Sequence, residues 1–374
     1  MTNTQLDRWT ALARRWCESH PPPVGSPMGS RTPRHEAEHV EWLNWSKAFH
    51  ASGLATMNWP REMGGAAVDA VTDYAVAEVL AAAGMPLPLT DIGLSMVAPA
   101  IHGFGDETQR RRHLGPIATG EVIWTQLFSE PEAGSDLASL RTAAAPGPDG
   151  RGGWIVNGQK VWSTYAHIAD WGFLLARTGS REERHRGLTV FLAPMDAPGV
   201  TIRPIREMTG DADYNEVFFE DVRLDDSAML GSLGGGWAIC MALMATERHH
   251  TGAQTANLLA ELDRMATIVA TLPDEHPVRA PFADAAARAG ALRGLLDAEL
   301  ADGAELVQKI VFSELNVEVH RLALELLSDP QLEVPRGWRA RWQDNYLYSR
   351  AYTISGGANE VLRNVLAKRH LGLT

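Results

Sequence analysis

Hydrophobic and polar positions divide the chain into three stretches with different periods. In the first third, small and apolar residues recur at three- and four-residue spacing, and one series comprises Val68, Val71, Ala75 and Val79. This spacing predicts a helix whose face with these residues belongs to the core. Proline, glycine and serine dominate residues 20–33. We expect a loop there, because proline removes a hydrogen-bond donor and glycine loosens the backbone.

Residues 121–230 follow a second pattern, typical of strands. Short runs of branched and aromatic residues are bounded by glycine, proline or aspartate, which predicts a small β domain. The runs lie at residues 154–156, 187–192 and 217–219. Asn157 and Gly158 stand between two β-rich runs and predict a hairpin, because both central positions of a type I′ turn require a positive φ.

Helical periodicity returns after the glycine-rich residues 231–236. Leu306, Ile310, Val317 and Leu324 form an apolar series at helical or heptad spacing, which predicts the seam of a helical bundle. The order of the three patterns predicts an α+β fold. Its parts are an N-terminal helical domain over residues 1–120, a central β domain over 121–230 and a C-terminal helical bundle over 231–374.

Composition and charge exclude several classes of function. Of the 374 residues, 45% are hydrophobic, which is enough for a substantial core. The net charge of -12 argues against broad binding to nucleic acid or anionic membranes, since both require clustered Lys and Arg. No apolar run approaches the ~20 residues of a membrane-spanning helix, and the start of the chain lacks the apolar core of a signal peptide. Cys17 and Cys240 are the only cysteines, so we expect a cytoplasmic protein that has neither disulfides nor a cysteine-rich zinc site. From the charge and the absence of a long apolar run, we expect no nucleic-acid and no membrane partner.

Two segments in the β-rich stretch carry candidate chemistry. The first, residues 129–136, reads Ser-Glu-Pro-Glu-Ala-Gly-Ser-Asp, and such a loop can expose backbone amides to an anionic ligand. Taken alone, it equally fits a structural turn capped by Ser135 or Asp136. The second, residues 157–164, reads Asn-Gly-Gln-Lys-Val-Trp-Ser-Thr.

Together the two segments resemble the flavin-binding signature of the acyl-CoA dehydrogenases. The family's first part reads Thr/Ser-Glu-Pro-x-Ala-Gly-Ser-Asp, and its second reads Asn-Gly-x-Lys-x-Trp-Ile/Ser-Thr/Ser. Shorter fragments agree in the same order, so the resemblance covers nearly the whole chain. They are Trp-Pro at 59–60, Gly-Gly at 64–65, Phe-Gly-Asp-Glu at 104–107, Gly-Pro-Ile at 115–117, Asn-Glu-Val-Phe-Phe at 215–219 and Gly-Gly-Ala-Asn-Glu at 356–360.

The resemblance implies a central β-barrel-like domain and a C-terminal four-helix bundle, with FAD between them. It also implies α,β-dehydrogenation of an acyl-CoA in lipid or steroid catabolism, with an electron-transfer flavoprotein or another acceptor as partner. It assigns FAD binding to Leu127, Ser129, Gly134, Ser135, Trp162, Ser163, Thr164, Gly357 and Glu360. The Leu127 backbone and the Ser129 hydroxyl would bind the flavin ring and Ser135 the pyrophosphate. Trp162 would pack on the ring, with Ser163 and Thr164 at its edge. Acyl-CoA binding is assigned to Ser135, Gly356 and Arg248.

The catalytic base requires a separate argument. Many family members carry it in a C-terminal Tyr-Glu-Gly-Thr segment, whereas residues 355–358 here read Ser-Gly-Gly-Ala, and Gly356 cannot accept a proton. Glu247 matches the alternative position of isovaleryl- and long-chain-type members and of some actinobacterial sterol side-chain enzymes. Glu247 follows Leu243 and Met244 by four and three positions, so it shares an apolar helix face. Burial on that face would raise the pKa of its carboxyl, as suits a base.

Two other segments depart from the family pattern. In homo-oligomeric relatives a neighbouring subunit holds the adenine half of FAD with an arginine and a phenylalanine early in one helix and with a Gly-Gly loop after another. We assign these to residues 271–275, Thr-Leu-Pro-Asp-Glu, and 326–331, Leu-Leu-Ser-Asp-Pro-Gln, and neither keeps the expected donors. We therefore expect the flavin-holding subunit of a heteromer, a heterotetramer with a paralogous chain, with a homo-oligomer as the alternative.

Two other functions stay open. His-Glu-Ala-Glu-His at residues 35–39 fits the HExxH pattern of zinc hydrolases, but no third ligand is evident, a solvated helix face explains the pattern better, and we expect no metal site. A non-catalytic partner subunit with this fold is the other alternative, against which the retained Ser129, Trp162 and Glu247 argue. Residues 234–236, Gly-Gly-Gly, lack the strand and lysine of a P-loop, so we interpret them as a linker into a helix.

Overall fold

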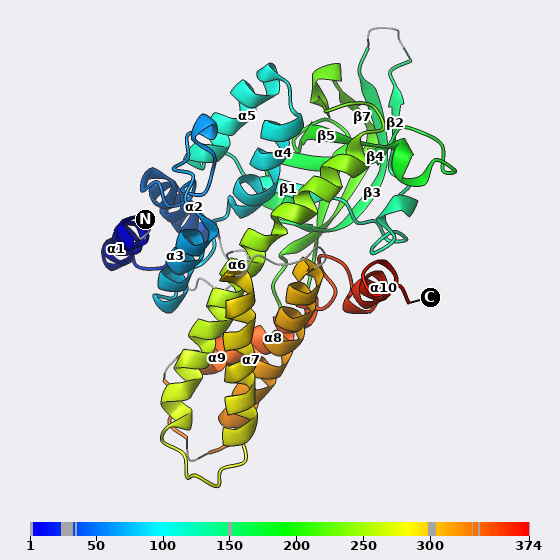
Figure 1. Cartoon of the computed structure of the whole chain (residues 1–374). Helices are drawn as coiled ribbons and strands as arrows, with labels where there is room; N and C mark the ends of the chain where they lie inside the picture. Colours follow the sequence, from blue (N-terminus) through cyan, green and yellow to red (C-terminus); the bar gives the residue numbers. More distant parts are fainter. Residues whose placement is uncertain are drawn as a thin grey trace.

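Three units follow one another along the chain (Figure 1). The computed structural model describes residues 3–23, 33, 36–148, 152–297, 304–330, 332–335 and 337–373, without the side chains of residues 3–4, 36, 244–251 and 296–297. The N-terminal unit contains α1 (Asn3–Ser19), α2 (Glu36–Ala51), α3 (Ala70–Ala82), α4 (Ala98–Phe104) and α5 (Glu107–Thr119). The order of helices, sheet and helices confirms the predicted α+β class. Most of the predicted loop at 20–33 lies outside the described residues.

Helix α3 begins at Asp69, whose carboxylate accepts a hydrogen bond from the Thr72 backbone N–H at 2.8 Å, as an N-cap does. The predicted core face was wrong in part, since Val71 is 49% exposed. Instead, Tyr74 and Ala81 are buried against helix α6 (Gly236–Val269). The helix is enclosed from more than one side, which a single apolar stripe does not predict.

The central unit is an eight-stranded mixed sheet with the order β6-β7-β3-β2-β4-β5-β8, and β1 pairs in parallel with β4. Its strands are β1 (Trp124–Leu127), β2 (Ala143–Pro146), β3 (Trp154–Thr164), β4 (Trp171–Arg177), β5 (Leu188–Pro194), β6 (Val200–Ile205), β7 (Tyr214–Leu224) and β8 (Met229–Leu230). The three predicted runs fall in β3, β5 and β7. The strand predictions are therefore confirmed.

The predicted hairpin at Asn157-Gly158 was wrong. Both residues lie inside β3, which continues across them to pair with β7. Asn157 Oδ1 accepts a hydrogen bond from the Asp221 backbone N–H at 2.9 Å, and Asn157 Nδ2 donates one to the Asp221 carboxylate at 3.0 Å. At this point the pairing of β3 with β7 shifts its register. The Asn-Gly pair lies at a bulge between two strands. Like a type I′ turn, this bulge requires a backbone angle that glycine adopts readily, the φ of 152° at Gly158.

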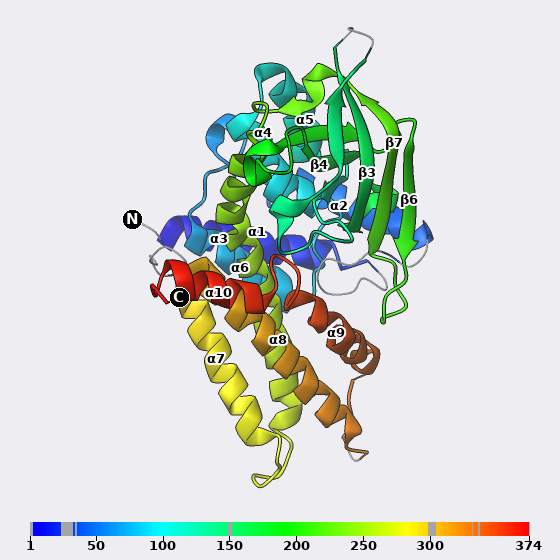
Figure 2. The same ribbon diagram turned by 90° about the vertical axis from the view of Figure 1, so that its right-hand side faces the viewer.

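The C-terminal unit contains α6, α7 (Arg279–Asp297), α8 (Ala304–Ser328), α9 (Trp338–Tyr352) and α10 (Asn359–Arg369). Helix α6 starts beside the sheet and continues into the bundle (Figure 1), and α10 lies at the end of the bundle that faces the sheet (Figure 2). Among the described residues, no helix has both the length and the apolar composition to cross a membrane.

The predicted seam of α8 is displaced by about half a turn. Ile310 is buried, but Leu306, Val317 and Leu324 are only half-buried. The buried series at alternating three- and four-residue spacing is Phe312, Leu315, Val319, Leu322 and Leu326. Two overlapping apolar series run along this helix, so the sequence alone did not decide which one faces the core.

Candidate active site

A bulge in β3 turns Trp162 out of the sheet. Lys160 pairs with Val217 and Ser163 with Asn215, so three steps on β3 oppose two on β7. Trp162, in the extra step, has a φ of 59° and is 57% exposed. Its ring meets Tyr214 edge-on at 6.0 Å between centroids. A bulge that re-aims a large aromatic side chain, at the cost of a strained backbone, is a feature of binding sites.

The two residues after Trp162 are fixed by polar contacts. The Ser163 carbonyl accepts a hydrogen bond from Asn215 Nδ2 at 3.0 Å, and the Thr164 carbonyl accepts one from Thr125 Oγ1 at 2.6 Å. The Ser163 side chain is 1% exposed and Thr164 is half-buried. A ligand on Trp162 would therefore reach the side chain of Thr164 more readily than the Ser163 hydroxyl.

The loop that follows β1 lies beside this bulge. Leu127 is buried at the end of β1, and the carbonyl of half-buried Ser129 accepts a hydrogen bond from the Val161 backbone N–H at 2.9 Å. Further along, Gly134 and Ser135 are exposed, and a Cβ atom at Gly134 would find open space. The loop thus leaves the core beside Val161 and reaches the surface at Gly134 and Ser135.

Ser135 joins the loop to the C-terminal segment. Its hydroxyl accepts a hydrogen bond from the Ala358 backbone N–H at 3.3 Å. Gly356 and Gly357 have φ values of 64° and 96°, which favour glycine. Lys309 Nζ donates to the Gly357 carbonyl at 2.7 Å. The structure therefore brings two segments together that are more than 200 residues apart in the sequence. Glu360 lies exposed in the first turn of α10.

Glu247 and Arg248 lie on α6, and their side chains are outside the described part of the structure. Their roles stay predictions. Elsewhere in the C-terminal unit, the Tyr348 hydroxyl on α9 lies 3.1 Å from the Tyr214 hydroxyl on β7, so α9 is tied to the strand that contacts Trp162. Gly356 supplies no carboxylate, as the sequence indicates.

A buried ion pair beneath the loop was not predicted from the sequence. Lys160 Nζ lies 2.8 Å from Glu130 Oε1, with side-chain exposures of 0% and 6%. Burial lowers the pKa of Lys160 to about 8, which the Glu130 carboxylate opposes. Burial alone would raise the pKa of Glu130, but the Lys160 ammonium and backbone donors hold it below its usual value. Glu130 belongs to the first motif and Lys160 to the second. A lysine inside a β-rich run was the one feature of the sequence that could have indicated a buried charge.

The zinc-hydrolase alternative gains no support. His35 lies outside the described residues, and His39 stands on α2. Within the described ranges, no group of three or more His, Cys, Asp or Glu side chains could hold a metal ion.

Comparison with known proteins decides the family. The acyl-CoA dehydrogenase N-terminal, middle and C-terminal domains match residues 7–121, 125–222 and 234–371. The chain belongs to the acyl-CoA dehydrogenase family. It is 37% identical over 355 residues to acyl-CoA dehydrogenase IpdE1 of Mycobacterium tuberculosis, covering 92% of this chain and 91% of that protein.

Solved structures show the same fold. The ChsE4-ChsE5 complex from Mycobacterium tuberculosis superposes with a TM-score of 0.82 at 26% identity, covering 100% of this chain and 98% of that one. The Tcur3481-Tcur3483 steroid acyl-CoA dehydrogenase gives a TM-score of 0.85 at 24% identity, covering 100% and 99%.

The family assignment makes this protein an FAD-dependent oxidoreductase that acts on the CH–CH bonds of an acyl-CoA. The described residues fit such a cofactor: Trp162 offers an exposed aromatic face on a strained bulge. The loop that bonds Val161 through Ser129 is open at Gly134 and meets the backbone of Ala358 through Ser135. A flat ring with a phosphate tail matches this combination of an indole face and exposed backbone.

Proposed function

We propose that Glu247 removes the α-proton of an acyl-CoA thioester while the substrate lies between α6 and the Trp162 bulge. FAD, when bound, supplies the acceptor of the β-hydride. The observation that carries the proposal is the exposed Trp162 on a bulge whose preceding residue, Val161, bonds Ser129 of the loop that also carries Ser135. The other FAD-binding and substrate-binding residues named from the sequence belong to the same proposal, as do the domain limits 1–120, 121–230 and 231–374.

The chain's own residues would prepare the proton transfer in two ways. Glu247 follows Leu243 by four positions on α6, which places the two on one helix face, and Leu243 is 6% exposed. Desolvation disfavours a charged carboxylate and makes it a stronger base. Backbone donors at the thioester carbonyl would then stabilise the charge that develops as the proton leaves.

We also propose that the chain works as the flavin-holding subunit of a heteromer. Residues 326–331 contain no Gly-Gly pair, and two similar structures are complexes of two different chains. The arginine and phenylalanine of the family pattern were assigned to residues 271–275, and this assignment was wrong. Helix α7 begins at Arg279, and Arg279 and Phe282 stand in its first turn. An arginine and a phenylalanine are therefore present early in a helix after all. The Tcur3481-Tcur3483 protein is a steroid acyl-CoA dehydrogenase, which supports a bulky acyl group here. An electron-transfer flavoprotein is the proposed acceptor.

Anaerobic mixing with a panel of acyl-CoAs tests the base. The wild type, with its partner subunit, should lose the flavin absorbance on mixing, and Glu247→Gln should not. Asp263→Asn is the matched control, because Asp263 is an exposed carboxylate on the same helix. Equal bleaching in wild type and Glu247→Gln would show that Glu247 is not the base. Absence of bleaching in every variant would favour the non-catalytic partner.

A further inference from the structure

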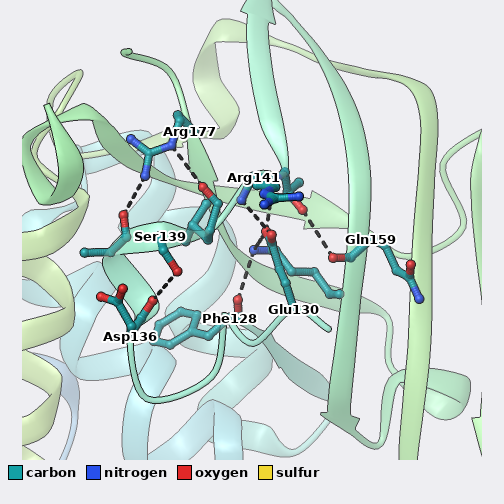
Figure 3. A network of polar contacts seen from close by, with 11 residues as sticks. Phe128, Glu130, Asp136, Ser139, Arg141, Gln159 and Arg177 are labelled. Atoms are coloured by element: carbon teal, nitrogen blue, oxygen red, sulfur yellow. Dashed lines mark hydrogen bonds and ion pairs between the residues drawn. The ribbon is translucent and has the colours of Figure 1, made fainter. Parts of the chain in front are cut away.

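Three buried charges lie beneath the loop at residues 128–142. Lys160 comes from β3, Arg177 from β4 and Glu130 from the loop itself, and their exposures are 0%, 7% and 7%. A charge inside a protein is stable only when it is paired and hydrogen-bonded. Each of these three is: Lys160 and Glu130 bond within the loop and its flanks, and Arg177 bonds two loop carbonyls (Figure 3). Arg177 also donates to the carbonyls of Ser180 and Arg184 after β4.

Lys160 and Glu130 fix the beginning of the loop. Lys160 Nζ donates to the Phe128 carbonyl at 3.0 Å and to Glu130 Oε1 at 2.8 Å. The Glu130 carboxylate also accepts hydrogen bonds from the backbone N–H groups of Arg141 at 2.6 Å and Thr142 at 2.9 Å. The pair therefore closes the loop, because one carboxylate binds both its far end and the lysine under its near end (Figure 3).

Arg177 fixes the other end of the loop. Its Nη2 atom donates to the Ala138 carbonyl at 2.7 Å and its Nε atom to the Leu140 carbonyl at 3.0 Å (Figure 3). Like the lysine, the arginine binds backbone carbonyls and leaves the loop's outer surface open. Two cations and one carboxylate are buried here, so the group carries one net positive charge.

This arrangement concerns the cofactor because of what Lys160 touches. Phe128 and Ser129 share a peptide group, and Ser129 is one of the residues proposed at the flavin ring. Two positions beyond Lys160 in the sequence stands Trp162, and the intervening Val161 bonds Ser129. Movement of the lysine would therefore displace both proposed walls of the ring site.

We propose that Lys160 is a positioning residue for FAD: it holds the Phe128–Ser129 peptide and Glu130 in place, and its charge favours the negative charge that the ring gains on reduction. This inference rests on the proposed placement of FAD. A lysine with only a structural role would be replaceable, together with its partner, by neutral side chains of similar shape, since buried ion pairs often contribute little net stability.

Three variants separate the two roles. Lys160→Met leaves the Glu130 carboxylate buried without its cation, so its unfolding midpoint should fall. The double variant Lys160→Met/Glu130→Gln removes both charges, so its unfolding midpoint should return most of the way to the wild-type value. It should nevertheless bind FAD at least tenfold more weakly, about 1.4 kcal/mol, because the Phe128 carbonyl loses its donor. Its midpoint potential should lie above that of Lys160→Met, since the net charge of the buried group is restored. Glu130→Gln alone keeps the ammonium and should shift the potential in the positive direction.

Fluorescence titration with FAD, anaerobic potentiometry and chemical unfolding provide these readouts without acyl-CoA, so an error at Glu247 does not affect them. The control is Arg288→Met/Glu318→Gln, which removes an ion pair of 2.6 Å between α7 and α8. A double variant with the wild-type FAD affinity would overturn the proposal. If Lys160→Met does not fold, Glu130→Gln decides, because an unchanged or more negative potential contradicts an electrostatic role.

Discussion

At the residue scale, His113 shows how burial makes stability depend on pH. Its ring packs edge-on against Trp124 at 5.4 Å and Trp171 at 4.8 Å. Burial, aided by the charge of Arg112, lowers its pKa from 6.5 to about 4. Between these two values the unfolded chain binds a proton that the folded chain does not. Stability is therefore complete above pH 6.5 and falls as the pH drops toward 4.

Replacing this histidine should flatten the pH dependence. In His113→Phe the aromatic contacts remain and the proton site is lost, so the slope of unfolding free energy between pH 6.5 and 4 should decrease by up to about 1.4 kcal/mol per pH unit. Urea unfolding at a series of pH values measures it. His185→Phe, at an exposed histidine, is the control. An identical slope in wild type and His113→Phe would contradict the role of this ring.

The same scale shows what the sequence could and could not predict about the site. The motifs located Trp162 and Ser135, because their residue types recur in a fixed order. The ion pair of Lys160 and Glu130 was missed, since the two residues are 30 positions apart and no local pattern indicates a contact between them. A buried lysine is recognisable only once its strand is known to face the core.

At the scale of elements, β3 depends on its glycine. Gly158 has a φ of 152°, and a Cβ atom there would lie 2.6 Å from Thr142 Cα and 2.5 Å from Thr142 Oγ1. Gly158→Ala should therefore lower the free energy of unfolding by more than about 1 kcal/mol. Gly290, on α7, has no atom within 4 Å of such a Cβ, so Gly290→Ala should raise it by about 0.5–1 kcal/mol. Denaturant titration compares them, and equal effects would refute the account of β3.

The elements themselves were predicted better than their contacts. Strands β3, β5 and β7 follow from runs of branched residues, because local preference and burial agree there. The hairpin at Asn157-Gly158 failed because positive φ values serve a bulge as well as a turn. The predictions of the buried faces of α3 and α8 were wrong in part, because both helices touch neighbours on more than one side. Their apolar residues therefore do not form a single stripe.

At the scale of the whole molecule, the proposed heteromer can be judged from the end of the bundle farthest from the sheet, where α7 begins. The connections α6–α7 and α8–α9 lie together there (Figure 1), and His276 Nε2 is 3.7 Å from the Asp329 carboxylate. Arg279, at the start of α7, donates hydrogen bonds to the carbonyls of Leu272 and Pro273. The Nε and Nη2 atoms of the arginine thus bond its own loop, and we therefore expect it not to hold the adenine of a neighbouring chain's cofactor.

This distinction yields an assembly prediction. If the chain holds its own flavin ring but offers no adenine site, a pair with a paralogous chain contains one complete FAD site, supplied in part by that paralogue. Co-expression should then give one FAD per pair, and Arg279→Gln should leave the stoichiometry and the affinity unchanged. Light scattering, which gives the mass, and flavin absorbance, which gives the cofactor content, test this. A homo-oligomer with one FAD per chain, weakened by Arg279→Gln, would instead show that the first turn of α7 reaches a neighbour's cofactor, and the heteromer would have to be abandoned.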